Sequence, residues 1–75
     1  MTRLPSLRPR QVVATLERAG FAVVRITGNH YQLFDAHTRR HTTVPHHNRD
    51  LPRGTLTAII HQAGLTREKF LDLLR

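Results

Sequence analysis

One histidine of this chain is placed where its imidazole can take part in a reaction. His30 follows the turn residues Gly28 and Asn29 and begins a short apolar stretch that ends at Phe34. Imidazole changes its charge near neutral pH, so such a side chain can take or give a proton in a reaction. The chain contains no cysteine, so this imidazole is the most plausible group in it for acting on a polyanion. The pattern alone is more typical of a histidine that only satisfies a backbone group at a strand end.

The charge of the chain favours an anionic partner. Twelve Lys and Arg against five Asp and Glu leave a formal net charge of +7 on 75 residues, and Lys69 is the only lysine. A guanidinium binds phosphate through two parallel hydrogen bonds, which suits RNA or DNA. Each of the arginines can also be an ordinary solvated side chain. Those expected to meet phosphate are Arg25, Arg39, Arg40, Arg49 and Arg53.

The first half of the chain predicts a helix and a hairpin. Apolar residues recur at helical spacing over residues 9–19, with proline at the start and glycine at position 20, as helix ends favour. Residues 21–26 form a dense apolar, β-branched run that suits a strand. Gly28 and Asn29 then supply turn chemistry, and residues 30–34 form the returning strand.

The second half predicts one more strand and two helices. A polar loop over residues 35–40 leads to a strand at 41–44, which Pro45 ends because it cannot donate to a ladder. After a polar loop at 46–53, helical spacing returns over residues 56–63, and Gly64 marks the stop. Thr66 is placed as the N-cap of a last short helix.

This order predicts an α+β fold of the form α-β-β-β-α(-α). Hairpins join neighbouring strands, so the simplest arrangement is a three-stranded antiparallel sheet with helices on one face. We expect residues 1–75 to form a single domain, because the length permits no second one. So short a chain buries only about 60% of its unfolded surface, so its stability margin should be thin. Alternation puts His30, Gln32 and Phe34 on one face of their strand. Which face meets the helices stays open, although His30 beside the turn should keep access to solvent.

Other classes of protein fit less well. No apolar run approaches the ~20 residues that cross a bilayer, and the first ten residues lack the apolar centre of a signal peptide. We therefore expect no membrane association and a cytoplasmic location. Six histidines suggest a zinc site, but zinc usually takes cysteine or carboxylate as well. The histidines that a zinc site would use straddle a strand and a loop: His37, His41, His46 and His47.

Several segments, taken together and in order, resemble the HicA (YcfA-like) toxin family. They are Leu16-Glu17-Arg18-Ala19-Gly20-Phe21, Gly28-Asn29-His30-Tyr31, Val44-Pro45-His46-His47, Gly54-Thr55-Leu56 with Ile59, and Gln62-Ala63-Gly64-Leu65. The resemblance implies a double-stranded-RNA-binding-like fold and a toxin of a type II toxin–antitoxin system. It also implies a ribosome-independent mRNA interferase, which is an endoribonuclease, and a HicB-like antitoxin as partner.

The resemblance also implies roles for particular residues. His30 occupies the position of the family's catalytic histidine, on a turn formed by Gly28 and Asn29, where Asn29 replaces the usual serine. His47 occupies a position where the family commonly has histidine, so it is a second proton-transfer group or a phosphate contact. Its other reading is a polar residue that shapes the loop. Cleavage that uses the RNA's own 2′-hydroxyl needs acid–base groups and positive charge, so we expect no metal and no cofactor.

Two other functions remain open from the sequence. A non-catalytic RNA-binding module can have a similar fold, but such domains gather lysines at the start of their last helix. Here Arg53 is the only cation beside Gly54 and Thr55. A protein that only docks on an acidic partner also fits the small core and the positive charge, and a toxin can do both.

Overall fold

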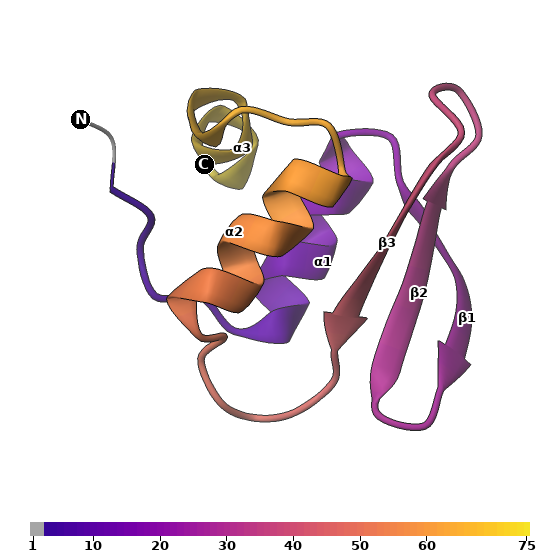
Figure 1. Ribbon diagram of the computed structural model, residues 1–75, viewed down its shortest axis with the longest axis horizontal. Helices are drawn as coiled ribbons and strands as arrows, with labels where there is room; N and C mark the ends of the chain where they lie inside the picture. Colours follow the sequence, from indigo (N-terminus) through magenta and orange to yellow (C-terminus); the bar gives the residue numbers. More distant parts are fainter. Residues whose placement is uncertain (1–2) are drawn as a thin grey trace.

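The computed structural model describes residues 3–75, and it has the predicted order of elements (Figure 1). These are α1 (Pro9–Arg18), β1 (Ala22–Thr27), β2 (His30–Asp35), β3 (Arg40–Pro45), α2 (Arg53–Gln62) and α3 (Arg67–Leu74). The strands form an antiparallel sheet in the order β1-β2-β3. The helices gather on one side of it, so the predicted α+β fold is confirmed.

The glycines and caps that the sequence marked end the helices as expected. Gly20, after α1, has φ +112°, and Gly64, after α2, has φ +75°. At both ends a backbone N–H one residue further on reaches back five residues, to the carbonyls of Leu16 and Ile60, the pairing of a helix stopped by a left-handed residue. The Thr66 hydroxyl accepts the Lys69 N–H at 3.1 Å, which confirms the cap of α3.

The core lies between the helices and one face of the sheet. Leu33 of β2 and Val44 of β3 are fully buried, together with Leu16 of α1 and Phe70 of α3. α1 packs across the sheet and also carries α3, while α2 packs on β3. On this inner face the Thr42 hydroxyl donates to the side-chain oxygen of Gln62 at 2.9 Å, which ties β3 to α2.

The segment before α1 belongs to the core as well. Leu4 and Leu7 are buried, although the sequence analysis counted no element there. The Leu51 N–H donates to the Leu7 carbonyl at 2.8 Å, so this segment is joined to the loop between β3 and α2. Residues 46–52, which we call the β3–α2 loop, are thereby held at the end of the sheet that carries the β1–β2 turn.

Asp35 ends β2 as a buried carboxylate with backbone donors. Its Oδ1 accepts the N–H groups of His37 at 2.9 Å and Thr38 at 3.4 Å. Burial raises the pKa of Asp35, but the His37 N–H and the Thr38 side chain and N–H outweigh it, so that the pKa lies below its usual value. This carboxylate therefore organises the β2–β3 turn in its charged form.

We expect Asp35→Asn to destabilise the protein at neutral pH and much less in acid. A lowered native pKa contributes stability that is complete above the unfolded value of about 3.9 and is lost as the pH falls through the native value. The free energy of unfolding in urea at pH 7 and pH 3 measures this, with Asp72→Asn, an exposed residue of α3, as control. An equal deficit of Asp35→Asn at both pH values contradicts the assignment.

Candidate active site

The structure decides which face of β2 the candidate histidine occupies. Leu33 is buried under the helices, so His30, Gln32 and Phe34 point to the opposite side, which we call the outer face. His30 is exposed and stands between Thr27 of β1 and Pro45 of β3 in the ladder. Within residues 3–75 its ring has no hydrogen-bond partner, so both of its nitrogens are available to a ligand.

A two-residue turn sets the position of His30. Gly28 has φ +56°, whereas Asn29 is not among the residues with positive φ, which is the pattern of a type II′ hairpin turn. A Cβ on Gly28 would touch nothing within 4 Å, so the turn needs glycine for its backbone conformation and not for space. Only one of the two residues therefore uses the left-handed region that both were expected to tolerate.

The β3–α2 loop is joined to this turn. The His46 N–H donates to the Asn29 carbonyl, and the His46 ring lies 4.7 Å from the Tyr31 ring at an interplanar angle of 48°. His47 follows in the same loop, and its Nδ1 accepts the Arg49 N–H at 3.1 Å. In a neutral ring this hydrogen bond leaves the proton on Nε2, which points away from the loop backbone as a donor. His30 and His47 are thus held at the same end of the sheet.

A basic pocket of about 220 Å³ opens beside this turn, where α1 begins. Its lining includes Tyr31 and the two loop histidines together with Arg8 and Arg10. Arg8 also lies 3.9 Å from the Asp50 carboxylate, with both side chains more than half exposed, so this ion pair is weak and an anion can displace it. The sequence analysis missed Arg8 and Arg10, and their position on both sides of the helix-starting proline was the only available signal.

The five arginines that the sequence analysis expected to meet phosphate are divided between the two ends of the sheet. Arg25 pairs with Gln32 on the outer face, two residues along from His30, and Arg49 and Arg53 lie in and after the β3–α2 loop. Arg39 and Arg40 belong to the opposite end, with Arg39 at φ +63° in the β2–β3 turn. The Arg40 side chain lies over Gly64 and donates to the Gln62 carbonyl at 3.4 Å, where it caps α2.

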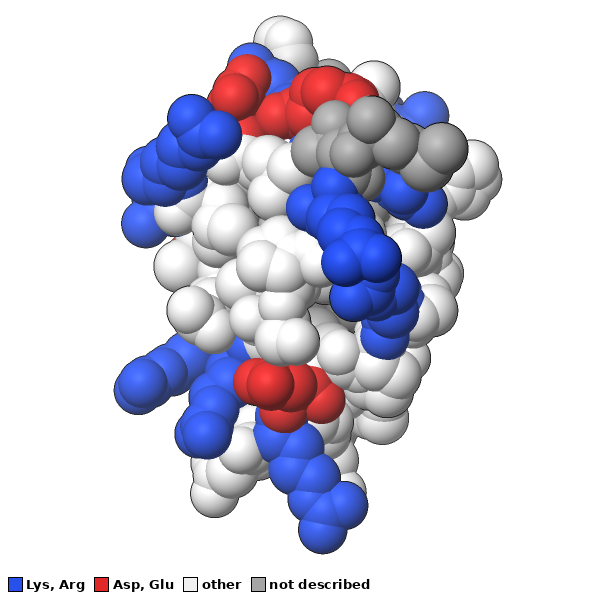
Figure 2. Space-filling view, turned by 90° about the vertical axis from the view of Figure 1, so that its left-hand side faces the viewer, with Lys and Arg blue, Asp and Glu red and all other residues white. Residues whose placement is uncertain are grey.

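Positive charge is spread over both ends of the molecule. On the side away from the sheet, an uncharged centre is surrounded by Lys and Arg side chains at the top, on both flanks and at the lower end, while acidic side chains lie at the top and within the lower basic group (Figure 2). Lys and Arg side chains project at the lower end, which is the end of the β1–β2 turn and the β3–α2 loop in Figure 1. The candidate residues around His30 therefore lie at an end of the molecule that is rich in positive charge.

The histidines considered for zinc do not come together. Within residues 3–75, no three side chains of the ligating types lie close enough to hold a metal ion. His37 lies in the β2–β3 turn and His41 on the outer face, away from His46 and His47 in the β3–α2 loop. In the same described part of the chain, none of the helices has the length and apolar character needed to span a membrane.

Fold and site together define a small, basic α+β protein of the double-stranded-RNA-binding-like class, with an exposed histidine at the start of its central strand. The family model described as HicA toxin of bacterial toxin-antitoxin matches residues 9–65, from the start of α1 to just past α2. The chain belongs to this HicA toxin family, and the resemblance noted from the sequence is confirmed. Membership makes it a toxin with an antitoxin partner. A comparison with curated proteins found no match.

Proposed function

We propose that this chain is an mRNA interferase, a metal-independent endoribonuclease in which His30 transfers protons at the scissile linkage. The observation that carries the proposal is the position of His30, exposed and without a hydrogen-bond partner in residues 3–75, at the strand start of a HicA family member. An imidazole engaged with the protein would have to break that interaction before it could act. The substrate being mRNA, we propose the cytoplasm as its place of action.

The reaction uses the nucleophile that RNA carries. The 2′-oxygen attacks the neighbouring phosphorus while a base takes its proton, and the bond from phosphorus to the 5′-oxygen breaks as that oxygen receives a proton. The products are a 2′,3′-cyclic phosphate and a 5′-hydroxyl. His30 is either the base or the acid of this scheme. Negative charge that develops on the phosphate is stabilised by guanidinium groups, and Arg25 shares the outer face with His30.

His47 is the second group of the proposal. It is held in the loop that the His46 N–H joins to the β1–β2 turn, and its Nε2 faces away from the loop backbone. From that position it can donate a hydrogen bond to a non-bridging phosphate oxygen or exchange a proton with the RNA. Arg49 and Arg53, in and after the same loop, are further candidates for contacts with the phosphates on either side.

His30→Ala should keep the fold and lower the cleavage rate by about 10²–10⁴, which is the usual cost of losing a positioned proton-transfer group. The ring is exposed and outside the core, so the thermal unfolding midpoint should hardly move. His61→Ala, which removes an exposed histidine of α2, is the matched control. The measurement is cleavage of labelled single-stranded RNA in EDTA. Full activity of the His30 variant, or a mobility shift without cleavage by the unaltered protein, refutes the proposal.

A single 2′-deoxyribose on the 5′ side of the cleaved linkage should block cleavage there, because the nucleophile is missing. Cleavage elsewhere in the same oligonucleotide should continue and serves as the internal control. Mass spectrometry of the products from all-ribose RNA should find the cyclic phosphate. Cleavage at the deoxy position would mean that water is the nucleophile and that the scheme is wrong.

Two substitutions separate the possible roles of His47. A glutamine places an amide N–H close to where the histidine Nε2–H stood, but it cannot transfer a proton at neutral pH. If His47 contacts phosphate, His47→Gln should keep most of the activity that His47→Ala loses. If His47 transfers a proton, both variants should lose about 10²-fold or more, and the pH–rate profile should lose one limb.

A further inference from the structure

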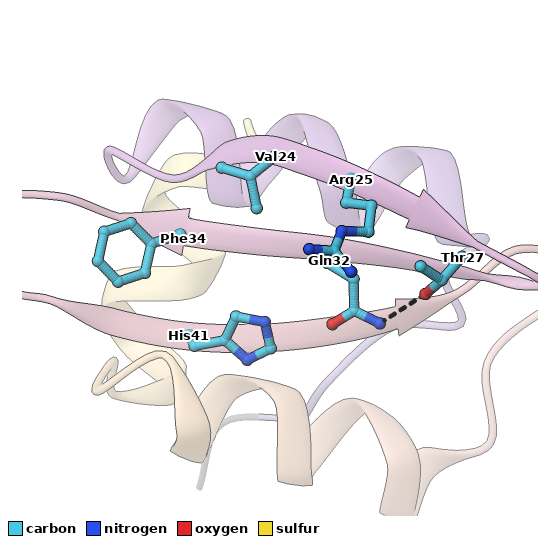
Figure 3. A pocket seen from close by; sticks show the side chains of 6 residues that line it. All are labelled: Val24, Arg25, Thr27, Gln32, Phe34 and His41. Atoms are coloured by element: carbon cyan, nitrogen blue, oxygen red, sulfur yellow. Dashed lines mark hydrogen bonds between the residues drawn. The ribbon is translucent and has the colours of Figure 1, made fainter.

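The outer face of the sheet carries a groove that shares only Arg25 with the proposed reaction. It has a volume of about 450 Å³, within the usual range for small-molecule sites, and its lining residues come from all three strands (Figure 3). They are Val24, Arg25, Thr27, Gln32, Phe34 and His41. α1 and α3 lie behind the sheet in this view, and the buried Leu33 points to their side, so the groove faces away from the core.

A bulge in β1 gives the groove two neighbouring side chains. Val23 pairs with Leu33 and Arg25 with Gln32, so the register shifts and Val24 has no opposite residue in β2. Both Val24 and Arg25 then line the groove. Val24 is 60% exposed, and the Arg25 side chain extends from β1 toward β2 (Figure 3). A regular strand would have turned one of these side chains to the other face.

The Gln32 amide is oriented by its neighbours. Its Nε2 donates to the Thr27 hydroxyl at 3.0 Å, and its Oε1 accepts the Thr43 hydroxyl at 3.0 Å. Each amide atom keeps one further hydrogen-bonding position, so a donor and an acceptor stand side by side over the groove. This pair matches the edge of a nucleobase, where a donor and an acceptor also lie next to each other.

Phe34 supplies the surface on which a base can stack. It follows Gln32 on the same face of β2, is only partly buried, and has His41 opposite it in β3. Exposed aromatic rings on a sheet are the usual platforms for bases of single-stranded RNA. Gln32 and Phe34 lie two and four residues from His30, about 7 and 13 Å along the strand, so a nucleotide next to the cleaved linkage can reach them.

Charge favours RNA over a protein as the occupant. The groove has the cation Arg25 and the titratable His41, and none of the residues that line it in the described chain is acidic. A partner protein would need to cover the wider face, whereas one base fills the space between Phe34, Gln32 and Arg25. A chain of phosphates that runs from His30 along β2 also passes Arg25.

We propose that this groove binds one nucleobase of single-stranded RNA beside the cleaved linkage, stacked on Phe34 and hydrogen-bonded through its edge to Gln32. Arg25 holds the adjoining phosphate. The inference rests on the proposed nuclease function for its meaning, but the binding itself can be measured without cleavage. It identifies a determinant of substrate choice in residues that stand apart from the proton-transfer groups.

The cleavage test uses an RNA oligonucleotide with one mapped cleavage site and versions with an abasic nucleotide on either side of it. Phe34→Leu, which keeps an apolar side chain without a ring, should lower the kcat/KM on the intact RNA by about 5- to 150-fold. One abasic version should slow the unaltered protein by a similar factor and should slow the Phe34 variant no further. Equal losses for both proteins on both abasic versions, or full activity of Phe34→Leu, overturn the proposal.

Controls distinguish a loss of base recognition from a loss of folding and from the effect of a substitution elsewhere on the sheet. Ile26→Ala trims a residue that is 57% exposed and pairs with Tyr31, facing away from the groove, so this variant should cleave near the original rate. Circular dichroism melts confirm that each variant is folded. Gln32→Glu replaces a donor with an acceptor and should change the order of preference among the four bases at the affected position. An unchanged order counts against the contact to Gln32.

A binding test separates this inference from the nuclease proposal. In the His30→Ala background, a fluorescein-labelled RNA of mixed sequence and a fully abasic strand of equal length are compared by fluorescence anisotropy. Base-dependent affinity that falls about 5- to 150-fold with Phe34→Leu supports the groove even if no cleavage occurs. Equal affinity of the protein for both strands overturns the inference. So does a result in which Phe34→Leu weakens binding of the antitoxin but leaves the affinity for RNA unchanged.

Discussion

The burial of Leu33 determines what the rest of β2 presents to solvent. Side chains alternate along a strand, so a core position at Leu33 turns His30, Gln32 and Phe34 to the outer face together. A shift of one residue in the pairing would bury His30 under the helices and expose Leu33. The penalty for exposing a fully buried leucine, about 2 kcal/mol or more, keeps the register in place. The exposure of the proposed catalytic group therefore follows from hydrophobic packing on the opposite face.

At the end of the sheet that carries His30, the chain segments are held together by backbone hydrogen bonds rather than by core packing. The Gly28 turn brings Thr27 opposite His30, and the Asn29 carbonyl accepts the His46 N–H. The Leu51 N–H then joins the same loop to Leu7. Because these are backbone hydrogen bonds, the His30 ring and the Nε2 atom of His47 stay free to face a ligand. Asn29, at the position of the serine expected from the resemblance, keeps this arrangement because its backbone carbonyl, and not its side chain, accepts the His46 N–H.

The sequence alone was enough to predict the helices and strands, but it was not enough to predict how the residues of the candidate site are arranged. Helical spacing, Gly20, Gly64 and the Thr66 cap located the helices because these signals act within a few residues of the chain. The face of β2 could not be chosen, since both sides of the strand carry an aromatic residue. That choice depends on which side chains fit against α1, and such packing is a property of the whole core.

The other features that the sequence could not predict depend on contacts between residues that are far apart in the chain. Arg40 was a candidate for phosphate, but it lies over the end of α2 with its guanidinium near the Gln62 carbonyl. The basic pocket at Tyr31 exists only because the β3–α2 loop folds back to the start of α1. Neither contact leaves a periodic trace, because the partners are separated by loops whose paths no local rule determines.

The residues that stabilise the fold and the residues of the proposed chemistry are different ones in this chain. The fully buried side chains come from the helices and the inner face of the sheet, whereas His30 and His47 are exposed, and Gln32 faces the same open side. A protein of 75 residues has little free energy of folding to lose, so a catalytic group buried in the core would make each change of chemistry a risk to the fold. On an open face, substitutions can alter the proposed contacts to RNA while Leu16, Leu33 and Phe70 continue to hold the structure together. Substitutions of the groove residues therefore leave the buried side chains that hold this fold together unchanged.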